Sequence, residues 1–298
     1  MTTLINNIQL EPKDYRSGIE PTWCPGCGDF SVLNSLTQTM SAQHIDPFKS
    51  VVVSGIGCSS RTPLWMKNYG FHSVHGRALP VATGIALANP DMPITVTIGD
   101  GDCFSIGGGH VPHAARRNFN MRLFVMDNQA FSLTKNQASP TSREGLKTST
   151  TPYGNIDAPM NVIELLLSYG ATFVAQTFAG NPKHMTEIMN KAMAHKGFAF
   201  VNILSPCPTF NKVDTFVYYR TRVQDINETH TDLSNKAKAF ELAATVNDHS
   251  KDENAKVPIG VFYQVQKETY GEKLKALKAR IGAKDTRDMN EIFNQYRP

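Results

Sequence analysis

The chain has 298 residues, of which 41% are hydrophobic and 19% are charged, with a formal net charge of +4. These values predict a globular protein with a full core. The charge is small and no basic cluster carries interleaved aromatic residues, which argues against a nucleic-acid partner. No apolar run is long enough to span a membrane. Residues 1–15 lack the pattern of a secretory signal, so a cytoplasmic protein is expected.

A pair of cysteines stands close to the start of the first predicted helix. Cys24 and Cys27 flank a Pro-Gly pair, which favours a tight turn. The apolar spacing over residues 30–36 predicts a helix, with Asp29 as its N-cap. Both cysteines are therefore expected on a loop that leads into a helix.

The next two elements are a strand and a helix of small residues. Residues 51–54 predict a buried strand, which runs into the glycine- and serine-rich sequence GIGCSSR at positions 55–61. Such a turn offers backbone N–H groups that can bind a phosphate. A helix is predicted over 78–88, where Asn89-Pro90 ends it.

Two strand ends carry the polar residues on which the functional interpretation depends. Residues 94–98 predict a strand ending in Gly-Asp-Gly-Asp, and residues 123–126 predict a second strand ending in Asp-Asn, with a helix over 110–117 between them. This order predicts neighbouring parallel strands, with Asp100 and Asn128 at one carboxyl edge of the sheet. A carboxylate, an amide and nearby carbonyls suit Mg²⁺ together with a bound phosphate. An ordinary acidic turn is the alternative.

The second half of the chain continues the alternation of strands and helices. A polar loop is predicted over 129–141, and residues 141–160, rich in Thr, Ser and Pro, have no periodicity, which at this length favours a functional role. A helix begins at 162, and another is predicted over 182–194, between strands at 171–175 and 198–204. The pattern predicts an α/β fold, with a mostly parallel sheet and helices on both faces.

From about residue 221 the charged fraction rises. Helices are predicted over 236–243 and 269–284, with a short extended piece at 257–263. We therefore expect a main domain over residues 1–220 and a helical C-terminal arm over 221–298 that packs on the core or on a partner.

Five cysteines without an export signal favour metal or redox chemistry over disulfides. Cys24, Cys27, Cys58 and Cys207 all fall on predicted loops, where they could converge. Four cysteines hold either Zn²⁺ or an iron–sulfur cluster, and a single close pair favours the cluster. Unrelated thiols are the alternative. Cys103 is interpreted as a small buried residue.

Several short sequences, taken in order, resemble the β subunits of the 2-oxoacid:ferredoxin oxidoreductases. They are WCPGCG, GIGCSS, HGRA, GDGD, DN and SPCP, between about residues 20 and 210. The resemblance implies the thiamine diphosphate-binding fold, with thiamine diphosphate, Mg²⁺ and a [4Fe–4S] cluster in this subunit and coenzyme A as co-substrate. It also implies an α subunit that completes the thiamine site, ferredoxin as electron acceptor and an (αβ)₂ heterotetramer.

The same resemblance assigns roles to individual residues. The cluster ligands would be Cys24, Cys27, Cys58 and Cys207, and the Mg²⁺ ligands would be Asp100, Asn128 and the carbonyl of Ala130. The residues around the cofactor would be Gly57, Cys58, Ser59, His75, Gly99, Asp100, Gly101, Asp102, Asn128, Ala130, Ser132 and Leu133. Leu133 would support the bent cofactor. His75 is equally consistent with a hydrogen-bonded polar residue of the core.

Two cations suggest the substrate. Arg61 follows the Cys58 loop and Lys135 follows the Asn128 loop, so both are expected to face the thiazolium and bind a second substrate carboxylate. This resembles the family members that convert 2-oxoglutarate, CoA and an oxidant to succinyl-CoA and CO₂. Pyruvate, a broad specificity and two solvated surface cations remain alternatives. So do a non-redox thiamine-dependent carboligase with structural zinc and a noncatalytic electron-transfer subunit.

Overall fold

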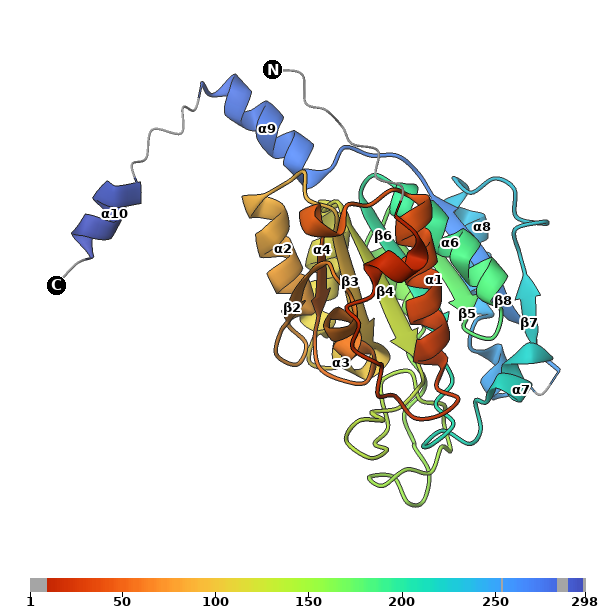
Figure 1. The fold of residues 1–298 in the computed structure, drawn as a ribbon. Helices are drawn as coiled ribbons and strands as arrows, with labels where there is room; N and C mark the ends of the chain where they lie inside the picture. Colours follow the sequence, from red (N-terminus) through yellow and green to blue (C-terminus); the bar gives the residue numbers. More distant parts are fainter. Residues whose placement is uncertain (1–9, 253, 283–288, 297–298) are drawn as a thin grey trace.

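A mostly parallel sheet runs through the protein (Figure 1). The computed structural model describes residues 10–252, 254–282 and 289–296. The strands within these ranges are β1 Val51–Ser54, β2 Tyr69–His72, β3 Ile94–Gly99, β4 Met121–Asp127, β5 Phe173–Phe178, β6 Phe198–Leu204, β7 Val223–Asp225 and β8 Val257–Gln264. Their order is β2-β1-β3-β4-β6-β5-β8-β7, and β8 pairs antiparallel with β5 whereas the other described pairs are parallel.

Helices cover both faces of the sheet, as the alternating sequence pattern predicts. The described helices are α1 Gly28–Ala42, α2 Ala78–Ala88, α3 Asp100–Phe104, α4 Val111–Arg117, α5 Val162–Ser168, α6 Pro182–Ala194, α7 Phe216–Arg220, α8 Lys236–Ala244, α9 Tyr270–Arg280 and α10 Met289–Gln295. One core lies under α1 and α6, and a second lies under α2, α4, α5 and α8 (Figure 1). Because both faces are covered, the central strands are buried along almost their whole length.

The central strand–helix–strand unit has the predicted arrangement. β3 and β4 are parallel neighbours, with Gly99 opposite Met126. Asp100 and Asn128 therefore follow adjacent strands at the same carboxyl edge. The segment between β4 and α5 contains no helix or strand of its own and extends beyond that edge (Figure 1).

Two local features differ from what the sequence predicted. Asp29 is not the N-cap of α1: Cys27 takes that position, and Asp29 is buried in the first turn, where its Oδ1 accepts a hydrogen bond from Ser205 Oγ over 2.8 Å. The edge strand β2 was not predicted, because its four residues are all exposed and carry no burial pattern.

The segment after residue 221 is more than a helical arm. β8 extends the main sheet, and Ala239 of α8 packs into one of the two cores. α9 ends at Arg280, and the predicted helix end at Lys284 lies outside the described residues. The domain boundary near residue 220 stays a prediction. The described helices include none with the length and apolar character needed to cross a membrane.

Candidate cofactor-binding site

A cavity opens at the carboxyl edge of β1, β3 and β4. Its walls come from the turn after β1, the segment before α2, the start of α3 and the loop after β4. The lining residues are Ile56, Gly57, Cys58, Ser59, His75, Gly99, Asp100, Gly101, Asp102, Asn128, Ala130, Phe131, Ser132, Leu133 and Thr134. Every residue predicted to surround the cofactor is among them. Ile56, Phe131 and Thr134 were missed: Ile56 lies within the GIGCSS sequence but was assigned no role, and Phe131 and Thr134 belong to none of the motifs.

The predicted Mg²⁺ ligands lie together in this cavity. Asp100 is buried and accepts a hydrogen bond from Thr141 Oγ1 over 2.7 Å, while the same hydroxyl lies 2.9 Å from Asp127 Oδ1. Burial raises the pKa of Asp100. Burial and the neighbouring Asp100 also raise the pKa of Asp127, to about 7. A divalent cation bound by Asp100, Asn128 and the Ala130 carbonyl would offset this buried negative charge, so the residues present fit Mg²⁺.

Asp102 joins two walls of the cavity. Its Oδ2 accepts a hydrogen bond from Ile56 N over 2.9 Å, and its Oδ1 accepts from Gly76 N and contacts His75 Nδ1. The carboxylate approaches Gly55 so closely that an added Cβ would lie 1.7 Å from Oδ2. Asp102 therefore positions the turn after β1 and the segment before α2, in addition to lining the cavity.

The other predicted wall residues differ in their surroundings. The hydroxyl of Ser132 is buried without a hydrogen-bond partner in the described part of the chain, which fits a wall that binds a polar ligand. His75 has a side chain that is 42% exposed, and its ring meets Phe131 edge-on at 5.9 Å between centroids. Leu133 is 48% exposed, so one side of the cavity is bordered by an uncovered apolar residue.

The loops that carry the four cysteines are in contact with one another. Trp23 Nε1 donates to the carbonyl of Cys58 over 2.8 Å, and Gly28 N donates to the carbonyl of Pro206 over 3.2 Å. The thiols are free. Burial raises the pKa of Cys58 to about 11, with further contributions from Asp29 and the thiols of Cys207 and Cys24.

Cysteine sulfur is the usual ligand of an iron–sulfur cluster, and bound iron would supply positive charge that favours deprotonation of these thiols. In the described residues no three His, Cys, Asp or Glu side chains are spaced as for a metal ion. The assignment of Cys24, Cys27, Cys58 and Cys207 as cluster ligands stays a prediction.

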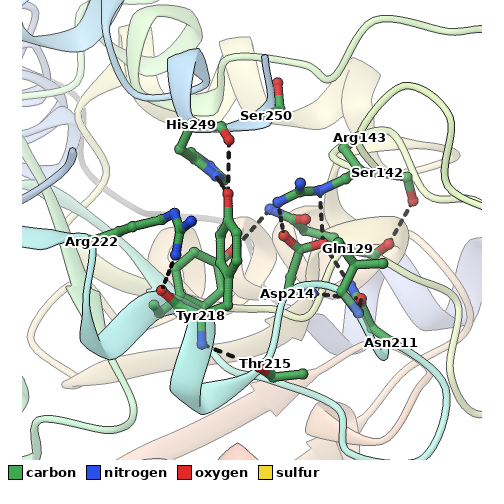
Figure 2. A network of polar contacts seen from close by, with 12 residues as sticks. Gln129, Ser142, Arg143, Asn211, Asp214, Thr215, Tyr218, Arg222, His249 and Ser250 are labelled. Atoms are coloured by element: carbon green, nitrogen blue, oxygen red, sulfur yellow. Dashed lines mark hydrogen bonds and ion pairs between the residues drawn. The ribbon is translucent and has the colours of Figure 1, made fainter. Parts of the chain in front are cut away.

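A polar network formed by residues of two distant segments is hydrogen-bonded to the loop after β4 (Figure 2). Arg143 pairs with Asp214, and Asp214 Oδ2 accepts a hydrogen bond from Asn211 Nδ2 over 3.1 Å. Asn211 Nδ2 also donates to the carbonyl of Asn128 over 3.2 Å. The guanidinium of Arg143 lies 4.8 Å from the centre of the Tyr218 ring. Sequence reasoning missed this network, because its members are far apart in the chain and form no local motif.

The two proposed substrate-binding cations lie outside the cavity lining. Arg61 Nη2 donates to Thr22 Oγ1 over 2.5 Å, and its guanidinium lies 5.2 Å from the centre of the Trp65 ring. Lys135 is exposed and directly follows Thr134, which lines the cavity. Each of these residues lies within two positions of a residue that lines the cavity, Ser59 or Thr134. Their role in substrate binding stays a prediction.

The comparisons with known proteins agree with this geometry. The family described as "Thiamine pyrophosphate enzyme, C-terminal TPP binding domain" matches residues 55–203. A second family, the C-terminal part of the pyruvate ferredoxin oxidoreductase beta subunit, matches residues 207–279. A 2-oxoacid:ferredoxin oxidoreductase β subunit of Aeropyrum pernix is 38% identical over 274 residues, which cover 89% of this chain and 87% of the relative.

The chain belongs to the β subunits of the 2-oxoacid:ferredoxin oxidoreductases. This confirms the family and the thiamine diphosphate-binding fold inferred from the motifs. The β subunit is also 36% identical to the 2-oxoglutarate synthase subunit KorB of Archaeoglobus fulgidus, over 92% of this chain and 97% of the relative.

A solved structure gives the same result for the fold. The β subunit superposes with a TM-score of 0.88 and 47% identity on a chain of the 2-oxoglutarate:ferredoxin oxidoreductase from Magnetococcus marinus, which was solved with 2-oxoglutarate, coenzyme A and succinyl-CoA bound. The match covers 98% of this chain and 97% of that chain.

Proposed function

We propose that this β subunit, together with its α partner, catalyses the CoA-dependent oxidative decarboxylation of 2-oxoglutarate to succinyl-CoA and CO₂, with ferredoxin as electron acceptor. The observation that carries the proposal is the cavity itself, because it gathers every residue that the family motif assigns to the cofactor. The names of the Archaeoglobus and Magnetococcus relatives support 2-oxoglutarate as the substrate. Pyruvate is the second candidate, because the family that matches residues 207–279 is named for it.

The cofactors follow from the residues that would hold them. Asp100, Asn128 and Ala130 would hold Mg²⁺, and the GIGCSS turn offers backbone N–H groups to the diphosphate. Bound thiamine diphosphate supplies an electron sink for decarboxylation, and a [4Fe–4S] cluster on the four cysteines supplies a one-electron acceptor. Cys58 and Ser59 both line the cavity, so the turn that would hold the diphosphate also carries a proposed cluster ligand.

An α subunit would complete the site. Large apolar side chains near the cavity are exposed, including Leu133 at 48%, Ile106 at 56% and Val74 at 68%. Ile106 lies against Gly76, beside the cavity-lining His75. Exposed apolar residues around a functional site indicate a surface that a partner covers. We therefore propose an αβ unit, paired as an (αβ)₂ heterotetramer, in the cytoplasm, where cysteine thiols stay reduced.

Arg61 and Lys135 would select the substrate. Each would reach the distal carboxylate of 2-oxoglutarate from a different loop, and charge-assisted hydrogen bonds would favour this dicarboxylate over pyruvate. Because Arg61 is held against Thr22 and Trp65, Lys135 is the freer of the two cations to approach a bound substrate.

The proposal is tested on the complex purified with its co-expressed α subunit in the absence of oxygen. We expect a brown complex whose visible absorbance bleaches on addition of 2-oxoglutarate and much less on addition of pyruvate. Bleaching by pyruvate alone would replace the substrate assignment. A colourless, zinc-containing complex would overturn the redox function and favour a carboligase. The β subunit alone is expected to show no turnover.

A further inference from the structure

Arg122 stands at the edge of the sheet opposite the cofactor cavity. It is the second residue of β4 and is paired in register with Thr95 of β3. In Figure 1 both strands point away from this amino edge, toward the long loop that follows β4. The side chain reaches the end of α6, where Nη2 donates to the carbonyls of Met193 and His195 over 2.7 and 2.8 Å.

These two bonds leave most of the guanidinium unpaired. Nε of Arg122 is buried without an acceptor, and Nη1 has no hydrogen-bond partner in the described ranges. No carboxylate of the described residues forms an ion pair with it. Burial alone lowers the pKa of Arg122, to about 10. The end of α6 offers partial negative charge to one nitrogen, but a largely buried cation with no counter-ion is costly to the fold.

A pocket lies beside this cation. Its apolar walls come from Ile45, Pro93, Ile94 and Met193. Asn120 adds an amide, and since its Oδ1 already accepts a hydrogen bond from Gly197 N over 3.2 Å, its Nδ2 is available as a donor. The lining also includes Thr95 and the exposed carboxylate of Asp91 at its rim. With one cation, one amide donor, one carboxylate and apolar walls, the pocket suits at most a single negative charge attached to a short hydrocarbon chain. A phosphate dianion would call for more positive charge.

We propose that this cavity binds a small monocarboxylate, with its carboxylate on Arg122 and Asn120 and its alkyl part against Ile45, Ile94 and Met193. The site is separate from the cofactor cavity, because the two lie at opposite edges of the sheet and share no lining residue.

The proposal is tested by titrating butyrate into the intact αβ complex and following the heat of binding. Arg122→Gln keeps a donor for the end of α6 but removes the charge, and we expect it to weaken butyrate binding about 10- to 100-fold. Arg117→Gln makes the same change of charge at an exposed position and is expected to leave the affinity unchanged. Equal affinities in both variants would overturn the proposal, and so would tighter Arg122-dependent binding of inorganic phosphate than of butyrate.

Asp91 provides a second test that does not depend on how well Arg122→Gln folds. Asp91 also lines the cavity and is exposed, so its carboxylate would repel a bound anion. We expect Asp91→Asn to tighten butyrate binding at unchanged thermal stability. Weaker binding together with a lower melting temperature would show that Asp91 itself neutralises Arg122, which would overturn the site. Crystals of the complex soaked in 4-bromobutyrate should show the anomalous bromine signal beside Ile45, and a signal confined to the cofactor cavity would also contradict the proposal.

Discussion

The side-chain amide of Asn211 donates a hydrogen bond to the main-chain carbonyl of Asn128 over 3.2 Å. Asn211 lies four residues beyond Cys207, and Asn128 is a proposed Mg²⁺ ligand. The loop that carries a proposed cluster ligand is thus bonded directly to the strand end that would hold the metal. Asp214, itself paired with Arg143, accepts a second hydrogen bond from the same amide (Figure 2).

Asn211→Ala should loosen the metal site without removing a ligand. Loss of a hydrogen bond behind a metal ligand typically weakens binding by about 10-fold or more. We therefore expect the Mg²⁺ concentration for half-maximal turnover of the complex to rise about 10-fold, with unchanged iron content. Asn254→Ala, at an exposed position, is the matched control. An Asn211→Ala complex with the parent's Mg²⁺ dependence would show that the network only supports the fold.

Asp100→Asn should separate the two cofactor sites. The substitution preserves the size of the buried side chain but removes the charge that a divalent cation would need. We expect the complex to lose Mg²⁺-dependent thiamine diphosphate binding while it keeps its visible absorbance and its iron and sulfide. Cys58→Ser should lose iron, and Cys103→Ala, at a buried thiol outside the proposed ligand set, should keep it. Joint loss of both cofactors in Asp100→Asn would make Asp100 a structural residue.

Lys135→Gln tests the substrate assignment. Loss of a charge-assisted hydrogen bond to the distal carboxylate should raise the KM for 2-oxoglutarate by about 10- to 100-fold. The KM for 2-oxobutyrate, which lacks that carboxylate, should change little. Lys147→Gln removes a charge from an exposed position of the same long loop and serves as the control. A parallel rise in both KM values would mean that Lys135 shapes the loop and does not bind the carboxylate.

Most of the residues that line the cavity could be predicted from the sequence, whereas the polar network behind the loop after β4 could not. The wall residues belong to short motifs at strand ends, and the order of strands and helices brings those ends to one edge, so a local pattern is sufficient to find them. Arg143 and Asp214 meet across 71 positions of the chain, and such a pair depends on tertiary packing that no local pattern shows. Asp29 is a favourable cap by residue type, yet contact with Ser205 turns it inward and leaves the cap to Cys27.

Gly55→Ala should disturb the cavity through Asp102. The new Cβ would lie 1.7 Å from Asp102 Oδ2, so the carboxylate must move and release the N–H groups of Ile56 and Gly76. We expect weaker thiamine diphosphate binding and a lower melting temperature. Gly84→Ala, in α2 with no atom within 4 Å of the new Cβ, should be neutral or stabilising by up to about 1 kcal/mol. Unchanged cofactor affinity in Gly55→Ala would contradict the positioning role of Asp102.

His195 should make the stability of the complex depend on pH. The side chain is buried, with Nε2 2.8 Å from Thr172 Oγ1, and burial together with the nearby Arg122 lowers its pKa to about 4. In the unfolded chain the pKa of a histidine is about 6.5. The unfolded state therefore binds a proton first as the pH falls, so this contribution to stability is complete above about pH 6.5 and declines toward pH 4.

The melting temperature of the complex measured between pH 7.5 and 5 checks this expectation. His195→Gln retains a polar partner for Thr172 but cannot take up a proton, so its melting temperature should fall less steeply with decreasing pH than that of the parent. His44→Gln, at an exposed position, should keep the parent slope. If His195→Gln and the parent lose stability at the same rate, protonation of His195 does not contribute to acid unfolding.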